Sequence, residues 1–318
     1  MTHFVRGSVL VALAVVGVAC ALGQNKIRLG VIPKGTTHIF WKSVEAGARS
    51  AGKELGVDIV WKGPVKENDR AQQISIVEQF VNEGVSGIVL APLDRTALVR
   101  PVQNAKTKKI PVVIIDSGLD GEPGKDFVSF VATNNRAGGK LGGDHLAALL
   151  GGTGKVVLLR YFVGSASTAE REDGFLASMS AARGITVTVN NRYAGATAGE
   201  AKTSSMNIID KVREANGVFC SNESSTFGML LALRQSNLAG KIRFVGFDTS
   251  PPLIEALRNG DIDALVAQDP TRMGYEGVKS VVRSIRGESV PSVIDTGVKL
   301  ITKKNIDTPE IKALLGTP

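Results

Sequence analysis

The chain has 318 residues, of which 43% are hydrophobic, 21% are charged and 5% are aromatic, with a formal net charge of +8. This composition is typical of a globular protein of about two domains, and it excludes disordered and fibrous chains. The only long apolar run lies at the N-terminus, which excludes an integral membrane transporter, and two cysteines exclude a disulfide framework.

The first 25 residues, Met1–Asn25, have the pattern of an export signal. Arg6 supplies a basic start, an apolar core spans about Val9–Val18, and small residues follow, so we expect cleavage near position 23. Two alternatives remain at this point. Cys20 could carry a lipid anchor, or the segment could be a membrane anchor, although its core is shorter than the ~20 residues that a membrane span needs. Export to the periplasm would leave Cys220 as a lone, buried thiol.

After this segment, short strand-like runs alternate with longer amphipathic helices. The predicted strands are Ile27–Ile32, Val57–Trp61, Gly87–Leu90, Pro111–Ile115 and Phe127–Val131. The helices between them are Phe40–Leu55, Arg70–Asn82 and Thr96–Lys106. The strands are nearly continuous in Val, Ile and Leu, which is typical of a parallel sheet covered by helices on both faces.

The same alternation then restarts. The predicted helices are Asn134–Leu150, Thr168–Ala182, Gly199–Glu214, Thr226–Ser236, Pro251–Asn259 and Arg272–Arg286. The predicted strands are Val156–Arg160, Ile185–Val189, Gly217–Cys220, Ile242–Phe247, Ala264–Gln268 and the extended run Asp295–Ile301. The pattern predicts an α/β protein with two doubly wound parallel-sheet domains.

We expect the chain to pass between these domains three times, near Val131, Ala267 and Asp295. The N-terminal domain would then comprise residues 26–131 plus 268–294, and the C-terminal domain residues 132–267 plus 295–318. Three crossings would form a hinge rather than a flexible tether.

Polar and turn residues follow most of the predicted strands. They are Pro33-Lys34, Ala91-Pro92, Asp116-Ser117, Ser221-Asn222-Glu223, Asp248-Thr249 and Gln268-Asp269. Ligands of open parallel sheets bind beyond the carboxyl ends of the strands. Two such edges facing each other would form a cleft lined with short polar side chains, suited to the hydroxyls of a polyol. Phe40 and Trp41 begin the first helix and could stack on a sugar ring.

The motifs of common enzymes are absent or misplaced in the sequence. The run Gly151–Lys155 (GGTGK) looks like a phosphate loop, but it follows a helix and precedes a strand, so we interpret it as a helix end. We interpret Gly138-Gly139 and Gly142-Gly143 as sites of close helix packing. Beyond the export signal the chain has only two histidines, His38 and His145, and one cysteine, so we expect neither a nucleophilic triad nor a metal site. We therefore expect no catalytic residues, no metal and no cofactor.

Several stretches resemble the type 1 periplasmic sugar-binding proteins of ABC importers, close to the ribose-binding type. The stretches are Phe40–Ala48, Gly87–Asp94, Ile110–Gly118, Ala132–Ala147, Ala169–Phe175, Gly217–Leu233, Val245–Pro251 and Val266–Val278. The resemblance implies the hinged fold of that family, in the Lac repressor-like superfamily. It also implies a sugar or sugar-like ligand held between the domains and delivered to a membrane permease.

The resemblance further implies which residues bind the ligand. They are the aromatic pair Phe40 and Trp41, the carboxylates Asp116 and Asp248, the amides Asn222 and Gln268, and the hinge residue Asn135. Some positions depart from the ribose type, which has Arg, Asn and Arg where this chain has Ser117, Ala91 and Ala169. We expect Lys34 and His38, in the longer loop 33–39, to replace the lost arginines, and ribose is then a poor candidate. The IPK start of this loop also resembles the autoinducer-2-binding and rhamnose-binding branch.

The sequence is also compared with two other classes of protein, ligand sensors and sugar-responsive transcription regulators. A sensor would present a sugar or an autoinducer-2-like signal to a chemoreceptor or sensor kinase. A sugar-responsive regulator would need a helix-turn-helix of about 50–60 residues before the core, whereas the first predicted strand starts at Ile27. The basic residues are scattered along predicted helices, so we expect no nucleic-acid partner and a monomer.

Overall fold

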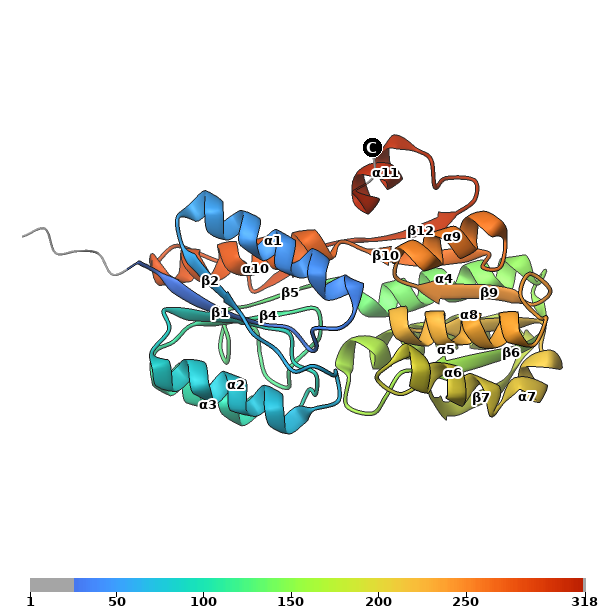
Figure 1. Ribbon diagram of the computed structural model, residues 1–318, viewed down its shortest axis with the longest axis horizontal. Coiled ribbons are helices and arrows are strands. Elements are labelled where there is room, and N and C mark those ends of the chain that lie inside the picture. Colours follow the sequence, from blue (N-terminus) through green and yellow to red (C-terminus); the bar gives the residue numbers. More distant parts are fainter. Residues whose placement is uncertain (1–25, 317–318) are drawn as a thin grey trace, which may run out of the picture.

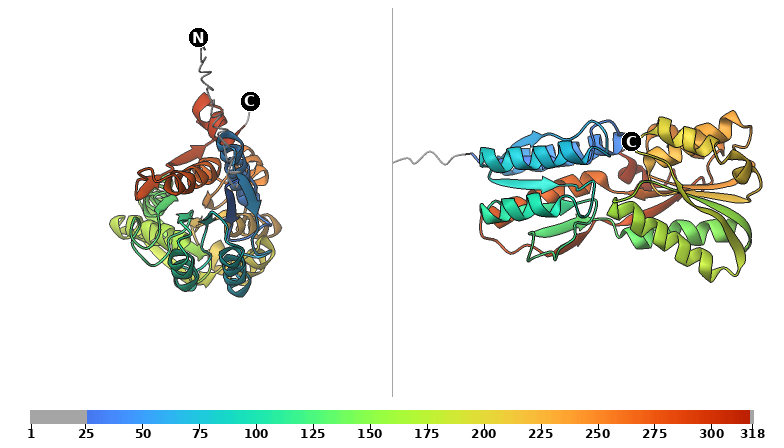
Figure 2. Two further views of the ribbon diagram at one scale, coloured as in Figure 1. Left: turned by 90° about the vertical axis from the view of Figure 1, so that its left-hand side faces the viewer. Right: turned by 90° about the horizontal axis from the view of Figure 1, so that it is seen from below.

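The computed structural model describes residues 26–316. The predicted export signal, including Cys20, lies outside these residues. Two six-stranded sheets lie end to end along the long axis, and helices cover both faces of each (Figures 1 and 2). Each sheet with its helices is called a lobe below.

The sheet of the first lobe is entirely parallel, in the order β11-β5-β4-β3-β1-β2. Its strands are β1 (Arg28–Ile32), β2 (Asp58–Trp61), β3 (Gly87–Leu90), β4 (Val112–Ile115), β5 (Ser129–Ala132) and β11 (Val293–Asp295). Helices α1 (Ile39–Leu55) and α10 (Pro270–Ile285) cover one face, and α2 (Arg70–Glu83) and α3 (Val99–Thr107) the other. Successive strand residues point to opposite faces, so Val89 packs with α1 and α10, and Leu90 packs with α2 and α3.

The second sheet has the order β12-β10-β9-β8-β6-β7. Its strands are β6 (Thr153–Arg160), β7 (Gly184–Tyr193), β8 (Gly217–Cys220), β9 (Arg243–Phe247), β10 (Ala264–Gln268) and β12 (Val298–Thr302). Helices α4 (Asn135–Leu149) and α5 (Ala166–Ala181) pack on one face. On the other lie α6 (Ala198–Met206), α7 (Ile209–Arg213), α8 (Glu223–Gln235) and α9 (Pro251–Asn259). The predicted α/β class with two doubly wound sheets is confirmed.

Two predicted elements were wrong, and one helix was not predicted. The helix expected over Gly199–Glu214 is two helices, α6 and α7, because the chain leaves helical geometry at Ile208 to bury that side chain in the core. The run expected over Asp295–Ile301 is two strands, since Gly297 turns the chain with a φ of 85° that favours glycine. The second of these, β12, runs antiparallel to β10. A further helix, α11 (Pro309–Leu315), was not predicted.

The chain passes between the sheets at three places. Residues 133–134 join β5 to α4, residue 269 joins β10 to α10, and residues 296–297 join β11 to β12. The first and third crossings touch, because Asp295 Oδ1 accepts a hydrogen bond from the backbone N–H of Asn134 at 3.3 Å. Thr133 Oγ1 also donates to the Gly297 carbonyl at 3.2 Å.

Glycines allow the helices to approach closely. A Cβ at Gly139 of α4 would overlap the carbonyl of Arg171 on α5, and a Cβ at Gly174 would overlap the carbonyl of Arg136. On the other side of α4, a Cβ at Gly142 would lie 2.6 Å from the Phe219 ring. The glycine pairs of this helix therefore serve packing against both α5 and the sheet.

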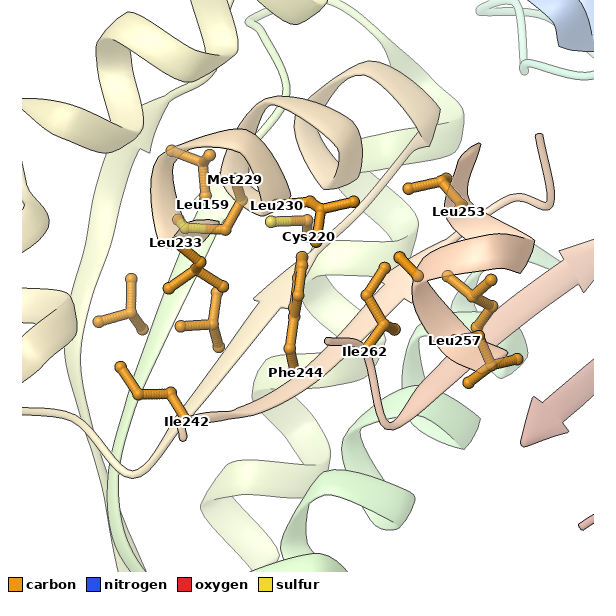
Figure 3. Packing of buried hydrophobic residues seen from close by; sticks show 14 of the residues in the cluster. Leu159, Cys220, Met229, Leu230, Leu233, Ile242, Phe244, Leu253, Leu257 and Ile262 are labelled. Atoms are coloured by element: carbon orange, nitrogen blue, oxygen red, sulfur yellow. The ribbon is translucent and has the colours of Figure 1, made fainter. Parts of the chain in front are cut away.

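The core of the second lobe holds the one cysteine of residues 26–316. Figure 3 shows Cys220 of β8 among Met229 and Leu230 of α8 and Phe244 of β9. Its side chain is fully buried, and burial raises the pKa of the thiol well above its usual range. The thiol is therefore an inert packing group in the folded protein.

Candidate ligand-binding site

A small cavity of about 30 Å³ lies between the lobes, where the carboxyl ends of strands from both sheets face each other. It is lined by Lys34, His38, Phe40, Trp41, Glu67, Asp116, Tyr161, Ser167, Thr168, Arg171, Asn222, Glu223, Asp248 and Gln268. Hydrogen bonds join the lobes across it, for example from Lys34 Nζ to Ser167 Oγ at 3.0 Å. The lobes are thus closed on each other.

The first lobe contributes a buried ion pair to the cavity. Lys34 follows β1 and is 3% exposed, and its Nζ lies 2.8 Å from Oδ2 of Asp116, which follows β4. Lys34 therefore holds a donor and Asp116 holds an acceptor at the same wall of the cavity.

The second lobe contributes three polar residues from adjacent strand ends. Asn222 follows β8 and caps α8, with its Oδ1 accepting from the backbone N–H of Ser225. Asp248 follows β9, and Gln268 ends β10. Gln268 donates to Asp248 Oδ1 at 2.7 Å, which fixes the orientation of both side chains.

Arg171 of α5 is held rigidly at the back of the cavity. Its guanidinium donates to Asn135 Oδ1, the Ser221 carbonyl and Gln268 Oε1 at 2.8 to 3.0 Å. It also stacks on the Phe247 ring, 4.1 Å from the ring centre. Asn135 therefore lies behind Arg171 and does not line the cavity.

A second buried cluster centres on Glu67, in the loop between β2 and α2. Its carboxylate lies 2.6 Å from His38 Nδ1, and it accepts from Trp41 Nε1 at 2.7 Å and from the Tyr161 hydroxyl at 2.8 Å. Burial opposes the charge on Glu67, but His38, Lys34 and the Trp41 bond outweigh it and lower its pKa to about 2. Burial likewise opposes the imidazolium, but Glu67, Glu223 and Asp248 raise the pKa of His38 to about 9.

The two carboxyl groups that the second lobe places in the cavity wall, Glu223 and Asp248, have raised pKa values, in contrast to Glu67. Burial, reinforced by the charge of Asp116, raises the pKa of Asp248 above its ordinary value. Burial and the neighbouring Asp248 raise the pKa of Glu223 in the same direction. This wall is a place where negative charge is costly and where a hydrogen-bond donor of a ligand would relieve that cost.

Eight of the nine predicted site residues line the cavity, and Asn135 is the exception. Lys34 and His38 both lie there, each paired with a carboxylate, and their replacement of the lost arginines stays a prediction. Sequence reasoning missed Glu67, Tyr161, Ser167, Thr168, Arg171 and Glu223. A signal existed for Glu223, which directly follows Asn222 at a strand end, and for Tyr161, which directly follows β6.

The cavity combines acceptor-only carboxylates with donor-only cations and two amides, a set suited to neutral hydroxyl groups. Within residues 26–316 no three or more His, Cys, Asp and Glu side chains gather to hold a metal ion. The same residues contain no helix with the length and apolarity that a membrane crossing requires.

Comparison with known proteins agrees with a binding site between two lobes. The model of the periplasmic binding protein domain matches residues 29–289. The chain belongs to the periplasmic binding protein family. This family consists of binding proteins, so the expected role as a solute-binding protein of the ABC-importer type, rather than an enzyme, is confirmed.

Solved structures of similar proteins share the fold of this periplasmic binding protein. A carbohydrate transporter solute-binding protein from Agrobacterium radiobacter, in complex with D-arabinose, is 36% identical with a TM-score of 0.87. The match covers 92% of this chain and 99% of that one. A solute-binding protein from Agrobacterium vitis with bound D-fucose is 35% identical with a TM-score of 0.86, covering 90% and 98%.

Among curated proteins, the ribose import binding protein RbsB of Haemophilus influenzae is similar to this periplasmic binding protein. It is 29% identical over 300 residues, which are 93% of this chain and 97% of that protein.

Proposed function

We propose that this protein is exported to the periplasm, where it captures a neutral monosaccharide between its lobes and delivers it to an ABC permease. The observation that carries the proposal is the enclosed ring of fixed donors and acceptors drawn from facing strand ends of both lobes. Hydroxyl groups can donate to its carboxylates and accept from its cations and amides. Relatives bound to D-arabinose and D-fucose support a pentose or a deoxyhexose as the first class to test.

The site proposal rests on the predicted contacts together with the missed ones. Phe40 and Trp41, whose rings meet edge to face at 5.0 Å, would cover the apolar face of the sugar ring. Asp116, Asn222, Asp248 and Gln268 would bind its hydroxyls. The domain boundaries in this proposal are the crossings at residues 133–134, 269 and 296–297, which lie within two residues of the expected boundaries 131/132, 267/268 and 294/295. Opening about these crossings would admit the ligand.

A thermal-shift screen of pentoses, hexoses, deoxyhexoses and polyols, followed by calorimetry, tests the proposal. We expect Asp248→Ala to weaken binding of the best sugar at least about tenfold, because a buried hydroxyl left without an acceptor costs about 1–3 kcal/mol. Asp261→Ala removes an aspartate of the same lobe that pairs with Arg234 outside the cavity, and should bind normally. The proposal fails if no sugar stabilises the wild type, and the site assignment fails if the two variants bind alike.

Three finer predictions belong to the same proposal and have separate tests. Reconstitution with the permease distinguishes transport from a chemoreceptor or sensor-kinase role, and autoinducer-2 in the screen tests the signalling ligand. Mass spectrometry of the exported protein distinguishes cleavage near position 23 from lipidation at Cys20. Light scattering tests the expected monomer.

A further inference from the structure

Glu67 differs from Asp116, Glu223 and Asp248 in the cavity wall, because protein side chains contact both of its carboxylate oxygens. Oε1 is shared by His38 and Trp41 of the first lobe, and Oε2 accepts from Tyr161 of the second. Only 6% of the side chain is exposed. Glu67 is therefore placed to act on a ligand through these three neighbours, and its set of contacts is complete only when the lobes are closed.

Of these three neighbours, His38 is the one whose protonation depends most on Glu67. Its Nδ1 is committed to Glu67, so Nε2 is the ring nitrogen left for a ligand. In a neutral imidazole with a proton on Nδ1, Nε2 can only accept a hydrogen bond, whereas in the imidazolium it donates. The charged groups around the ring are Glu67, Glu223 at the start of α8 and Asp248 after β9, and Lys34 acts in turn on Glu67. The three acidic groups favour the imidazolium over the opposing effect of burial.

The rest of the wall explains why a donor is needed here. Asp116, Glu223 and Asp248 line the cavity, and each is an acceptor when it is ionised. A sugar hydroxyl has a single proton, so one that donates to a carboxylate must accept from another group through its oxygen. A neutral His38 would add one more acceptor to a wall that already has several.

On the basis of the proposed function, we propose that Glu67 is a positioning residue for sugar recognition. It holds His38 so that Nε2–H donates to a ligand hydroxyl throughout the neutral pH range. It also fixes the Trp41 indole and links both to Tyr161 of the opposite lobe. Sugar affinity should then be insensitive to pH around neutrality, and this insensitivity should depend on Glu67.

Glu67→Gln keeps the shape of the side chain and removes its charge. With the best sugar from the screen, we expect wild-type affinity to change less than about twofold between pH 6 and pH 8. In Glu67→Gln it should fall by about tenfold or more over the same range, because loss of the Glu67 charge lowers the pKa of the buried His38 and the imidazole then loses its proton as the pH rises. Adding His38→Gln should abolish that slope. Glu172→Gln alters a buried carboxylate outside the cavity and should leave the profile flat.

A flat profile for Glu67→Gln with unchanged affinity would overturn the inference. A second measurement needs no Glu67 variant and no ligand, because His38 and Glu67 pair within the first lobe. It follows the imidazole NMR signals of the wild type between pH 5.5 and 8, with His38 assigned by its absence in His38→Gln. We expect His38 to show no titration in this range, and a midpoint near 6.5 would overturn the inference. If no sugar binds the wild type, the proposed function fails, while the NMR titration still decides the state of His38.

Discussion

At the scale of single residues, Asp116 and Asp248 occupy matching places in the two lobes. Each follows a central strand, and each has a positive φ, 62° and 70°, in the left-handed region that residues other than glycine seldom adopt. Such a conformation has a conformational cost and persists at sites where the surroundings enforce it. The matching backbone turns aim two carboxylates at one cavity from opposite sides.

The ion pair between His38 and Glu67 gives a residue-scale prediction about stability and pH. The pKa of His38 rises from 6.5 to about 9 on folding, so its stabilisation is complete below pH 6.5 and is lost as the pH rises through about 9. The pKa of Glu67 falls from 4.5 to about 2, so its stabilisation is complete above pH 4.5 and is lost as the pH falls through about 2. The pair contributes fully between pH 4.5 and 6.5.

We therefore expect the free energy of unfolding in urea to decrease from pH 6.5 to pH 9.5 by a few kcal/mol more in the wild type than in His38→Gln. The comparison of the two proteins removes the contributions of groups other than His38. Equal slopes for the two proteins would contradict the assignment of the charge to this pair.

At the scale of elements, the close contact of α4 and α5 predicts the response to one added methyl group. Gly139→Ala would push a Cβ into the Arg171 carbonyl, and we expect a loss of about 1–3 kcal/mol, which is typical of overpacking. Gly199 lies near the start of α6, where an added Cβ meets nothing closer than Thr197 Oγ1 at 4.0 Å. Gly199→Ala should be neutral or stabilising by up to about 1 kcal/mol. Urea unfolding measures both, and equal effects would mean that α4 and α5 pack less closely than described.

The elements that sequence analysis placed well share a physical property. The strands Gly87–Leu90, Gly217–Cys220 and Ala264–Gln268 have the predicted bounds, because each is an apolar run ended by a turn or polar residue. Site residues at strand ends were predictable for the same reason, since parallel strands bring their carboxyl ends to one edge. The role of Glu67 could not be predicted from the sequence, because Glu67 lies in a loop and its partners come from α1 and from the other lobe. No local pattern marks such a residue.

At the scale of the whole molecule, a clasp outside the cavity also joins the two lobes. It consists of Arg70 and Arg95 of the first lobe and residues 162–164, the loop after β6. Arg70 Nη2 donates to the Val163 carbonyl at 2.8 Å, and the backbone N–H of Arg95 donates to the Gly164 carbonyl at 3.0 Å. The Arg70 guanidinium also lies 5.7 Å from the centre of the Phe162 ring. These contacts exist only when the lobes are closed.

We expect Arg70→Ala to release bound sugar several-fold faster, because the loss of a hydrogen bond worth about 1 kcal/mol favours the open state. Stopped-flow dissociation measures the rate, and small-angle scattering should show a radius of gyration that falls less on ligand binding than in the wild type. Arg28→Ala is a matched control, since that side chain pairs with Glu83 in its own lobe and is similarly exposed, 44% against 43%. Identical rates for the two variants, or no compaction of the wild type by sugar, would contradict this view of closure.

The third crossing has a consequence for how the polypeptide acquires its structure during synthesis. Residues 293–295 supply an edge strand to the first sheet, and residues 298–302 supply one to the second. Because ribosomes build the chain from its N-terminus, the first sheet cannot be completed before residue 295 has been made, nor the second before residue 302. A nascent chain that lacks both edge strands would leave β5 and β10 each unpaired along one edge, and the two lobes would reach their final structure almost together.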